Sequence, residues 1–323
     1  MRRPKGHAGA CFEVMVPARD EAHNLGHLLP SLKGCTVTVF DDESSDGTGE
    51  IASSLGAKVV QPGGSLPPGW TGKARACQTL ADLATEDWVV FLDADTRPGA
   101  DFVAGLSSFL ASLPPKTEVV TGFPRMLPGS GLEPGYLFWV PWILLATNPF
   151  GLVARTGLGH NMFLNGQFSA WRRETLARER PFEAVRDKVL DDVNIGRLLA
   201  RHKVRVEVID VSRILEVKMY PDLRSAFLGM TKNTAEVIPG PMGWAVFALL
   251  LAVLGWVWLT GGSLWWVFGL VLLGSGGLVN SIVKMPFWCL VSLPLSLLSG
   301  AWTSVVSAVR RSRGELEWKG RRV

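Results

Sequence analysis

The sequence predicts an α/β protein in which a doubly wound, mostly parallel sheet is followed by transmembrane helices. Before about residue 240, short apolar runs alternate with amphipathic stretches, which is the strand and helix alternation of such a sheet. One of these runs, Trp88–Leu92, ends in two carboxylates one residue apart, Asp93 and Asp95. Within Met242–Val309, in contrast, Lys284 is the only charged side chain, which is typical of membrane segments. We therefore expect a catalytic domain over residues 1–240, a transmembrane region over 241–310 and a basic tail over 311–323.

The first part of the predicted domain contains five candidate strands, each apolar and bounded by polar or turn-forming residues. Trp88–Leu92 suits a strand that is buried on both faces of a parallel sheet. Helices are predicted between the strands, and either Asp46 or Thr48 can cap the second of them. The Gly- and Pro-rich segment Gly63–Gly72 is expected to be a loop. The five strands are Phe12–Val16, Thr36–Phe40, Ala57–Val60, Trp88–Leu92 and Glu118–Thr121, and the helices end near Leu32, Leu55, Leu83 and Leu113.

This regular alternation stops at Phe123. The segment 123–160 is rich in aromatic residues, Pro and Gly and carries little charge, which fits either a buried core or a helix in the membrane interface that admits the acceptor. Further on, we expect helices over Arg172–Arg180 and from Asp191 to Leu199, a strand over Val204–Ile209 and a helix over Leu223–Val237.

Three apolar segments follow, Met242–Thr260, Leu264–Val283 and Pro286–Val309, each close to the roughly 20 residues that cross a bilayer. Six basic residues lie in the last fourteen positions, and such clusters usually face the cytoplasm. If all three segments spanned, the tail and the predicted catalytic domain would lie on opposite sides, so we expect two or three spans, with a Gly-rich stretch or Pro294 marking any segment that does not cross. The expected location is the cytoplasmic membrane, multi-pass, with the catalytic domain facing the cytoplasm.

Composition narrows the possible functions. The formal net charge is +4 and the basic residues form no stripe with interleaved aromatics, so nucleic acid is not an expected partner. The four cysteines have no metal-binding or redox spacing. No signal peptide is expected near residue 1, and a dinucleotide-dependent oxidoreductase is disfavoured because no G-x-G-x-x-G follows the first strand.

Acidic residues follow two of the predicted strands and open a helix. Asp93 and Asp95, at period two on extended backbone, offer hard oxygen ligands to a divalent cation that also holds phosphate oxygens. An Asp-rich turn that merely closes the strand is the alternative. Asp191 and Asp192 open a predicted helix, where a simple capping pair is the alternative.

Taken together, these motifs resemble the inverting family-2 glycosyltransferases with a GT-A fold. The resemblance covers roughly residues 12–235, and the G-W-x-G-K element with Glu317–Arg321 is similar to the membrane-bound branch that glycosylates carotenoids, hopanoids or sphingolipids. The motifs that carry it, in order, are Pro17–Glu21, Phe40–Thr48, Gly69–Lys73, Phe91–Asp95 and Asp191–Asp192.

The resemblance implies a role for each matching residue. Asp95 would bind Mg²⁺ or Mn²⁺, and Asp192 would be the general base that deprotonates the acceptor hydroxyl. Lys73 would contact the donor's phosphates. The remaining donor-binding residues implied are Pro17, Arg19, Glu21, Asp42 and Asp93.

On the acceptor side, Gln167 is the candidate that matches the family's segment, at Asn165–Gln167. His160 can orient the acceptor or be structural, and Trp139 and Trp142 can flank an apolar acceptor or belong to a core or to a lipid-facing surface.

Two departures from the family pattern stand out. Asp191 replaces the usual Glu before the base, which leaves its role open. The arginine-tryptophan motif of processive synthases is absent after Tyr220, which favours the addition of a single sugar.

The sequence therefore predicts a membrane-associated, metal-dependent hexosyltransferase that moves one hexose from a nucleotide sugar, with UDP-glucose favoured, to a lipid-soluble acceptor such as a carotenoid, hopanoid or related terpenoid. Two rival functions are a polyprenyl-phosphate glycosyltransferase, for which Arg155, Arg172 and Arg173 could bind the lipid phosphate, and a catalytically silent nucleotide-sugar-binding membrane protein.

Overall fold

The computed structural model describes residues 9–147, 164–234 and 265–315, with scattered residues between 245 and 256 and between 317 and 322. The chain divides into two compact units. The sheet unit comprises residues 1–125 and 152–217, and the helical unit comprises residues 126–151 and 218–323.

A seven-stranded sheet forms the centre of the sheet unit, in the order β3-β2-β1-β4-β8-β6-β9. Strands β1 to β4 pair in parallel, β6 pairs in parallel with β9, and β8 is antiparallel to both of its neighbours, β4 and β6. The bounds are β1 Phe12–Ala18, β2 Thr36–Asp41, β3 Lys58–Val60, β4 Trp88–Leu92, β6 Val119–Phe123, β8 Phe168–Arg172 and β9 Val206–Asp210.

The predicted α/β architecture with a mostly parallel sheet is therefore confirmed. All five expected strands occur, and the strand expected at Val204–Ile209 is β9. The antiparallel strand β8 was not expected, because a helix was predicted to begin at Arg172.

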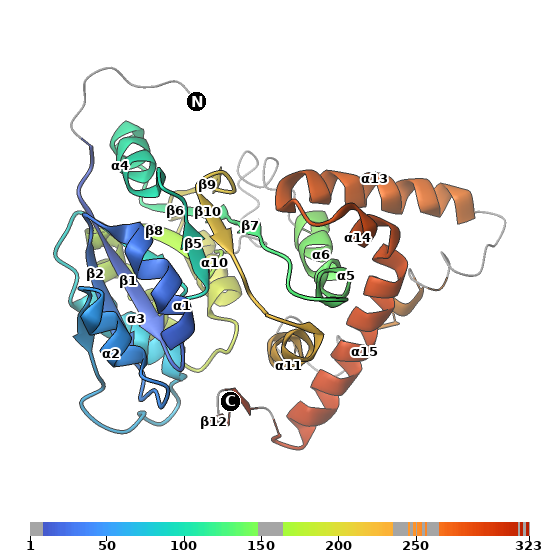
Figure 1. Ribbon diagram of the computed structural model, residues 1–323, viewed down its shortest axis with the longest axis horizontal. Coiled ribbons are helices and arrows are strands. Elements are labelled where there is room, and N and C mark those ends of the chain that lie inside the picture. The colour runs from blue at the N-terminus through green and yellow to red at the C-terminus, as the bar shows by residue number, and fades with distance from the viewer. Residues whose placement is uncertain are drawn as a thin grey trace. The chain divides into compact units, whose positions relative to one another are not determined.

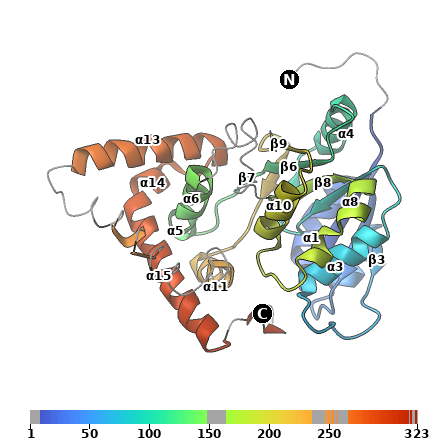
Figure 2. The same ribbon diagram turned by 180° about the vertical axis from the view of Figure 1, so that it is seen from behind.

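Helices cover both faces of the sheet. Figure 1 shows α1 and α2 in front of it, and Figure 2, from behind, shows α3 and α8 in front of it. The helices of this unit are α1 Ala22–Leu28, the 3-10 helix η1 Leu29–Leu32, α2 Thr48–Ser54, α3 Gly72–Asp82, α4 Phe102–Ser112, α8 Arg173–Glu179, α9 Pro181–Ala184 and α10 Asp191–Arg201.

The alternation of side chains along each strand separates two cores. Val14 and Val16 of β1 pack with α1, α2 and α4, whereas Met15 between them packs with α3, α8 and α10. Because both faces are covered, β4 is buried along its whole length, which explains why its sequence is continuously apolar.

Two short strands, β5 (Thr96–Pro98) and β10 (Leu215–Val217), pair antiparallel beside this sheet. The two-residue strand β7 (Arg125–Met126) lies where the chain passes from one unit to the other.

The helical unit has its own apolar core, to which Tyr136, Phe138, Trp139 and Leu297 contribute. Of the aromatic segment 123–160 the structure describes residues 123–147, of which residues 136–139 and 142 belong to this core whereas Leu132 is 68% exposed, and a role of the segment at the membrane interface stays a prediction. The elements of the unit are α5 Glu133–Leu137, α6 Trp139–Thr147, α11 Leu223–Thr234, α13 Trp265–Val283, α14 Phe287–Val291, α15 Leu293–Ser312, and the paired strands β11 Glu317–Trp318 and β12 Arg321–Arg322.

Transmembrane helices were predicted over 241–310. Among the residues that the structure describes, no helix is both long and apolar enough to cross a membrane. Most of the first predicted segment, Met242–Thr260, lies outside the described residues. The second corresponds to α13, which continues without interruption through its Gly-rich stretch, and the third is divided into α14 and α15 at Ser292, two residues before Pro294.

Candidate active site

The carboxyl ends of β1, β2 and β4 meet at one edge of the sheet, where ligands of open α/β sheets bind. After β4, the chain turns at Asp93, whose carbonyl oxygen accepts hydrogen bonds from both the backbone N–H (3.1 Å) and the hydroxyl (2.8 Å) of Thr96. Strand β8 pairs with β4 so that Leu92 faces Phe168, and the N–H of Asp93 reaches the carbonyl of Gln167 at 3.3 Å. The segment that ends at Gln167 therefore lies beside the first of the two acids.

Lys73 lies in the first turn of α3, which Thr71 caps by accepting a hydrogen bond from the N–H of Ala74 at 3.2 Å. The Lys73 ammonium is 2.9 Å from one carboxylate oxygen of Asp93 and 3.2 Å from the other. The side chain of Lys73 is 40% exposed and that of Asp93 is 25% exposed, so both can be reached by a ligand. The Lys73 ammonium is thus paired with Asp93, the acid that follows β4.

Asp191 and Asp192 open α10, as predicted. The carboxylate of Asp191 is buried and accepts a hydrogen bond from the N–H of Asp192 at 3.0 Å, and the carboxylate of Asp192 accepts one from the N–H of Val193 at 2.7 Å. The N-cap is Leu190 and no side-chain capping bond is formed, so the two acids lie in the first turn, where the helix dipole favours negative charge. The carbonyl of Asp192 accepts the N–H of Leu164 at 3.2 Å, which ties α10 to the segment before β8.

Gly166 brings these groups together. A Cβ added there would lie 3.5 Å from the Lys73 Nζ and 3.6 Å from an Asp192 carboxylate oxygen. The loop is held by the N–H of Asn165, which donates to the Thr121 hydroxyl at 2.9 Å, and by the Asn165 side chain, which accepts the N–H of Gln167 at 2.9 Å. Acids from two distant motifs and the lysine therefore surround one glycine.

Asp42, at the end of β2, is buried between two guanidinium groups. Arg75 of α3 forms an ion pair with one of its carboxylate oxygens. Arg19 lies 4.0 Å from the other and donates to the Asp42 carbonyl at 2.6 Å. Arg75 also donates to the carbonyl of Gly64 at 3.0 Å, so it joins Asp42 to the predicted Gly- and Pro-rich loop.

The loop after Asp42 carries further polar side chains, and three of them accept hydrogen bonds from the backbone that follows β1. Ser44 accepts the N–H of Asp20 at 2.9 Å, Thr48 accepts that of Glu21 at 2.8 Å and Asp46 accepts that of Ala22 at 2.9 Å. These bonds fix the backbone that follows β1, which carries the predicted donor residues Arg19 and Glu21, and Pro17 lies at the end of β1 itself.

The surroundings shift the pKa values of several of these groups. Burial, and then the neighbouring Asp191, raise the pKa of Asp192 to about 7. Burial, followed by Asp93 and Glu21, raises the pKa of Asp95 to about 8. Burial alone would lower the pKa of Lys73, but the carboxylates of Asp191 and Asp93 raise it well above its usual value. A carboxylate with a pKa of about 7, such as Asp192, can act as a base near neutral pH. A carboxyl group with a raised pKa, such as Asp95, is stabilised in its ionised form by a nearby cation.

The residues around Asp95 fit a divalent cation. One of its carboxylate oxygens is buried and has no hydrogen-bond partner among the residues that the structure describes. Within the described ranges, no group of three or more His, Cys, Asp or Glu side chains is arranged to hold a metal ion. Mg²⁺ is commonly held by one or two carboxylates together with the phosphates of a substrate, and Asp95 with its neighbour Asp93 offers that set.

Three predicted acceptor-side residues remain, His160, Trp139 and Trp142. His160 is outside the described residues. Trp139 and Trp142 belong to the core of the helical unit, where the Trp142 indole donates to the Ser275 hydroxyl at 3.0 Å. Their role toward an acceptor stays a prediction.

Three polar residues of this region were not predicted. Arg75 is buried in α3 between Ala74 and Ala76, and a cation between two small apolar residues is a signal that sequence reading could have used. Arg97 continues the period of Asp93 and Asp95 and donates to the Asn24 side chain at 2.5 Å. Asn24 in turn donates to Glu21 at 2.6 Å.

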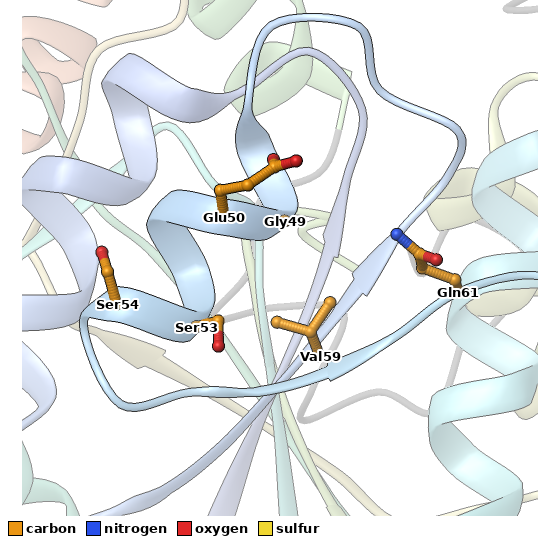
Figure 3. Close-up of a pocket in the computed structure, with 6 residues that line it drawn as sticks. All are labelled: Gly49, Glu50, Ser53, Ser54, Val59 and Gln61. Carbon is orange, nitrogen blue, oxygen red and sulfur yellow. The ribbon is translucent and has the colours of Figure 1, made fainter.

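A separate hollow lies on the surface of the sheet unit (Figure 3). None of the predicted site residues lines it, so it has no part in the site described above. Its lining comes from α2, β3 and the residue after β3, namely Gly49, Glu50, Ser53, Ser54, Val59 and Gln61.

A mostly parallel α/β sheet with acids and a lysine at the carboxyl ends of its strands belongs to the doubly wound class, in which ligands bind at this edge. The profile of the family described as "Glycosyl transferase family 2" matches residues 13–177, which include Lys73 and Asp93 but not the acids that open α10. The chain belongs to this family.

Relatives of known name point to one branch of the family. The chain is 35% identical over 104 residues to a 4,4'-diaponeurosporenoate glycosyltransferase of Staphylococcus haemolyticus, and 36% identical over 86 residues to that of Staphylococcus aureus. These matches cover 30% and 25% of this chain, and 27% and 23% of the relatives. The predicted resemblance to the carotenoid branch is confirmed, and the chain spans only about a quarter of the curated relatives' length.

Solved structures support the fold. A mannosyltransferase from Pyrobaculum calidifontis, in complex with GDP-Man and Mn²⁺, aligns over 96% of this chain and 91% of its own, with a TM-score of 0.58 and 17% identity. A glucosyl-3-phosphoglycerate synthase from Mycobacterium tuberculosis aligns over 68% and 79%, with a TM-score of 0.46 and 21% identity. The first of these likenesses confirms the GT-A type of fold.

Proposed function

We propose that this protein transfers one hexose from a nucleotide sugar, UDP-glucose, to a lipid-soluble acceptor such as a carotenoid, hopanoid or related terpenoid, with inversion at the anomeric carbon. The observation that carries the proposal is the meeting of Lys73, Asp93 and Asp192 around Gly166. This arrangement supports a site in which the Lys73 ammonium binds the donor's phosphates and the Asp192 carboxylate, close to it, deprotonates the acceptor. The carotenoid-glycosylating relatives support the class of acceptor.

The donor is bound along the strand ends. Asp42, held between Arg19 and Arg75, accepts the imide N–H of uracil or a ribose hydroxyl, while the backbone at Pro17 lines the ring. Lys73 binds the diphosphate as a point charge and Asp93 faces the sugar or ribose. Glu21 completes the pocket from the loop after β1.

Asp95 would hold Mg²⁺ or Mn²⁺ with the donor's phosphates, because its unpartnered buried oxygen is the ligand such an ion requires. When bound, the cation neutralises the negative charge of the departing diphosphate.

The transfer itself is a single displacement. Asp192 takes the proton of the acceptor hydroxyl as that oxygen attacks the anomeric carbon, and the bond from this carbon to the diphosphate oxygen breaks. The nucleoside diphosphate leaves with the electron pair of that bond, and the sugar is inverted. The pKa of about 7 suits Asp192 to this role near neutral pH. Gln167, next to Asp93, is the polar group proposed to orient the acceptor.

A lipid-soluble acceptor requires access to a membrane. We therefore propose that the protein works at the cytoplasmic membrane, with the sheet unit facing the cytoplasm, where nucleotide sugars are made. Transfer to a polyprenyl phosphate is less favoured, because Arg172, one of the cations proposed to bind the lipid phosphate, stacks over the ring of Trp88 at 4.3 Å.

The direct test is nucleotide release from the purified full chain, offered UDP-glucose or GDP-mannose with Mg²⁺ or Mn²⁺, with and without a neutral-lipid extract of the host. Release of UDP that needs both metal and lipid, and that Asp192→Asn abolishes while UDP binding persists, is the expected result. If folded wild-type protein binds UDP but releases none under every combination, it is a silent binding protein and the proposal fails. If lipid phosphate replaces the neutral lipids as the required acceptor, the polyprenyl alternative is correct.

A further inference from the structure

Large hydrophobic side chains are unevenly exposed between the two units. Among the described residues, all but three of those that are exposed belong to the helical unit, and the three exceptions are Ile51, Leu55 and Leu83. Soluble surfaces rarely gather so many apolar side chains on one part of a chain. The helical unit therefore presents an apolar surface that requires a partner.

Helix α15 contributes a clear stripe to this surface. Leu295, Trp302, Val305 and Val309 are each 42% to 63% exposed, and their spacing of seven, three and four places them on one side of the helix. No charged residue interrupts the stripe before Arg310.

The opposite, buried side of α15 is rich in hydroxyl-bearing residues and also carries Leu293 and Leu297. Ser296, Thr303, Ser304 and Ser307 are each at most 2% exposed, and Gly300 lies close against the Trp139 ring. Each hydroxyl has a partner inside the unit: Ser296 donates to the Tyr136 carbonyl at 3.2 Å, Thr303 to that of Ser299 at 2.8 Å, Ser304 to that of Gly300 at 2.8 Å and Ser307 to that of Thr231 at 2.5 Å.

Toward its protein neighbours the helix therefore presents small and hydroxyl-bearing residues together with Leu293 and Leu297, whereas toward its surroundings it presents large apolar side chains. A helix on a water-exposed surface has the reverse arrangement. Small and hydroxyl-bearing residues at helix contacts, with large apolar residues outside, are the pattern of helices that face hydrocarbon.

Helices α13 and α14 also expose large apolar side chains. On α13, Leu270, Val271 and Leu278 are 61% to 69% exposed, while Leu272 and Val279 are buried. On α14, Phe287 is 74% exposed. Figures 1 and 2 show the three helices following one another at the outer part of the unit.

The charged residues around this surface favour a lipid bilayer, rather than a protein, as its partner. Arg310, Arg311 and Arg313 follow the apolar stripe at the end of α15, and within residues 265–315 the only acidic residue is Glu315. Exposed tryptophans at positions 266, 288 and 302 are of the type that anchors at membrane interfaces. Apolar side chains bordered by basic ones match a bilayer that contains anionic lipid.

We propose that the exposed faces of α13, α14 and α15 contact the acyl chains of an anionic bilayer, with Arg310, Arg311 and Arg313 at the lipid head groups. This deepens the membrane part of the proposed function. The test below measures vesicle binding without sugar transfer, so either proposal can fail while the other stands.

The experiment is flotation of the purified full chain, exchanged from detergent, with vesicles of phosphatidylcholine alone or with phosphatidylglycerol. The test variant is Leu295→Gln/Trp302→Gln/Val305→Gln on α15. The matched control, Ile51→Gln/Leu55→Gln/Leu83→Gln, removes the same number of exposed hydrophobic residues from the sheet unit. We expect the wild type and the control to float, and the test variant to bind at least about tenfold more weakly, since each buried side chain contributes on the order of 1.5 kcal/mol or more.

A second variant keeps the test decisive if the first one fails to fold. Arg310→Gln/Arg311→Gln/Arg313→Gln removes three positive charges at the end of α15 and should remove the preference for phosphatidylglycerol while leaving binding to neutral vesicles. Equal flotation of wild type and both variants would overturn the proposal. So would a wild type that does not float but forms a dimer that the α15 variant abolishes, because the surface would then bind a second copy of the chain.

Discussion

The ammonium of Lys73 lies 2.9 Å from a carboxylate oxygen of Asp93, so the first turn of α3 and the turn after β4 are joined at the proposed phosphate site. Around them stand Asp191 and Asp192, and no second lysine or arginine shares this ion pair in the described part of the chain. Lys73 therefore balances the negative charge of these acids, and its exposed ammonium can also bind the donor's phosphates.

Lys73→Met should raise the donor KM or Kd by at least about tenfold, because a charge-assisted contact to phosphate is lost and the acids repel the diphosphate without compensation. Lys73→Arg should retain part of the affinity, since it keeps the charge with a different geometry. Calorimetric titration with UDP measures both effects. The matched control is Lys58→Met, an exposed lysine of β3, and an equal loss of affinity in that variant would show that the effect is not specific to the site.

The pH dependence of turnover tests Asp192 as the base. Because its pKa is raised to about 7 and only the ionised form accepts a proton, kcat should rise with pH through about 7 and then level off. Asp191 raises that pKa by its like charge, so Asp191→Asn should move the rise to lower pH by about half a unit to one unit. An unchanged profile in Asp191→Asn would mean that another group sets the pH dependence.

In the absence of metal, we expect the Asp95 carboxyl group to lower the free energy of unfolding as the pH rises. The folded protein holds the Asp95 proton up to about pH 8, whereas the unfolded chain releases it near about pH 4, so the free energy of unfolding falls as the pH rises between these values. Asp95→Asn should therefore stabilise the metal-free protein at pH 8 by about 1 kcal/mol or more, and should abolish the stabilisation that Mn²⁺ with UDP gives the wild type.

Denaturant unfolding with and without Mn²⁺ and UDP measures both changes. Asp101→Asn is the control, because this exposed carboxylate at the start of α4 makes no side-chain capping bond. If Asp95→Asn is no more stable than this control and still responds to Mn²⁺, the cation is not held by Asp95.

The sequence was sufficient for most of the sheet because its parallel strands are buried on both faces. Trp88–Leu92 was predicted with the bounds that the structure has, since its apolar run can hardly be placed otherwise. Strand β8 was missed because Arg172 at its end resembles a helix start. In the structure, the guanidinium of Arg172 lies over the Trp88 ring at 4.3 Å, a contact between distant segments that no local pattern reveals.

Some features of the site could also be predicted from the sequence, whereas others depend on how distant segments pack. Acids at strand ends are visible in the sequence, because parallel strands bring their carboxyl ends to one edge. The ion pair of Arg75 with Asp42 depends on how α3 packs on β2, and it could not be predicted from either segment alone. The C-terminal region was predicted from hydropathy, which measures how apolar a segment is but not that the hydroxyl-rich side of α15 turns inward and its apolar side outward.

Gly166 provides a test of the space between the lysine and the base. A Cβ there would make ordinary contacts, at 3.5 Å to the Lys73 Nζ and 3.6 Å to Asp192, so Gly166→Ala should fold with nearly unchanged stability. Because the methyl group would occupy space between the two functional groups, we expect kcat/KM to fall by about tenfold or more. At Gly122, by contrast, a Cβ would lie 2.7 Å from the Ile209 carbonyl oxygen. Gly122→Ala should therefore lower the melting temperature, which Gly166→Ala should leave nearly unchanged. Thermal unfolding with steady-state kinetics separates the two, and a fully active Gly166→Ala would mean that no substrate passes between Lys73 and Asp192.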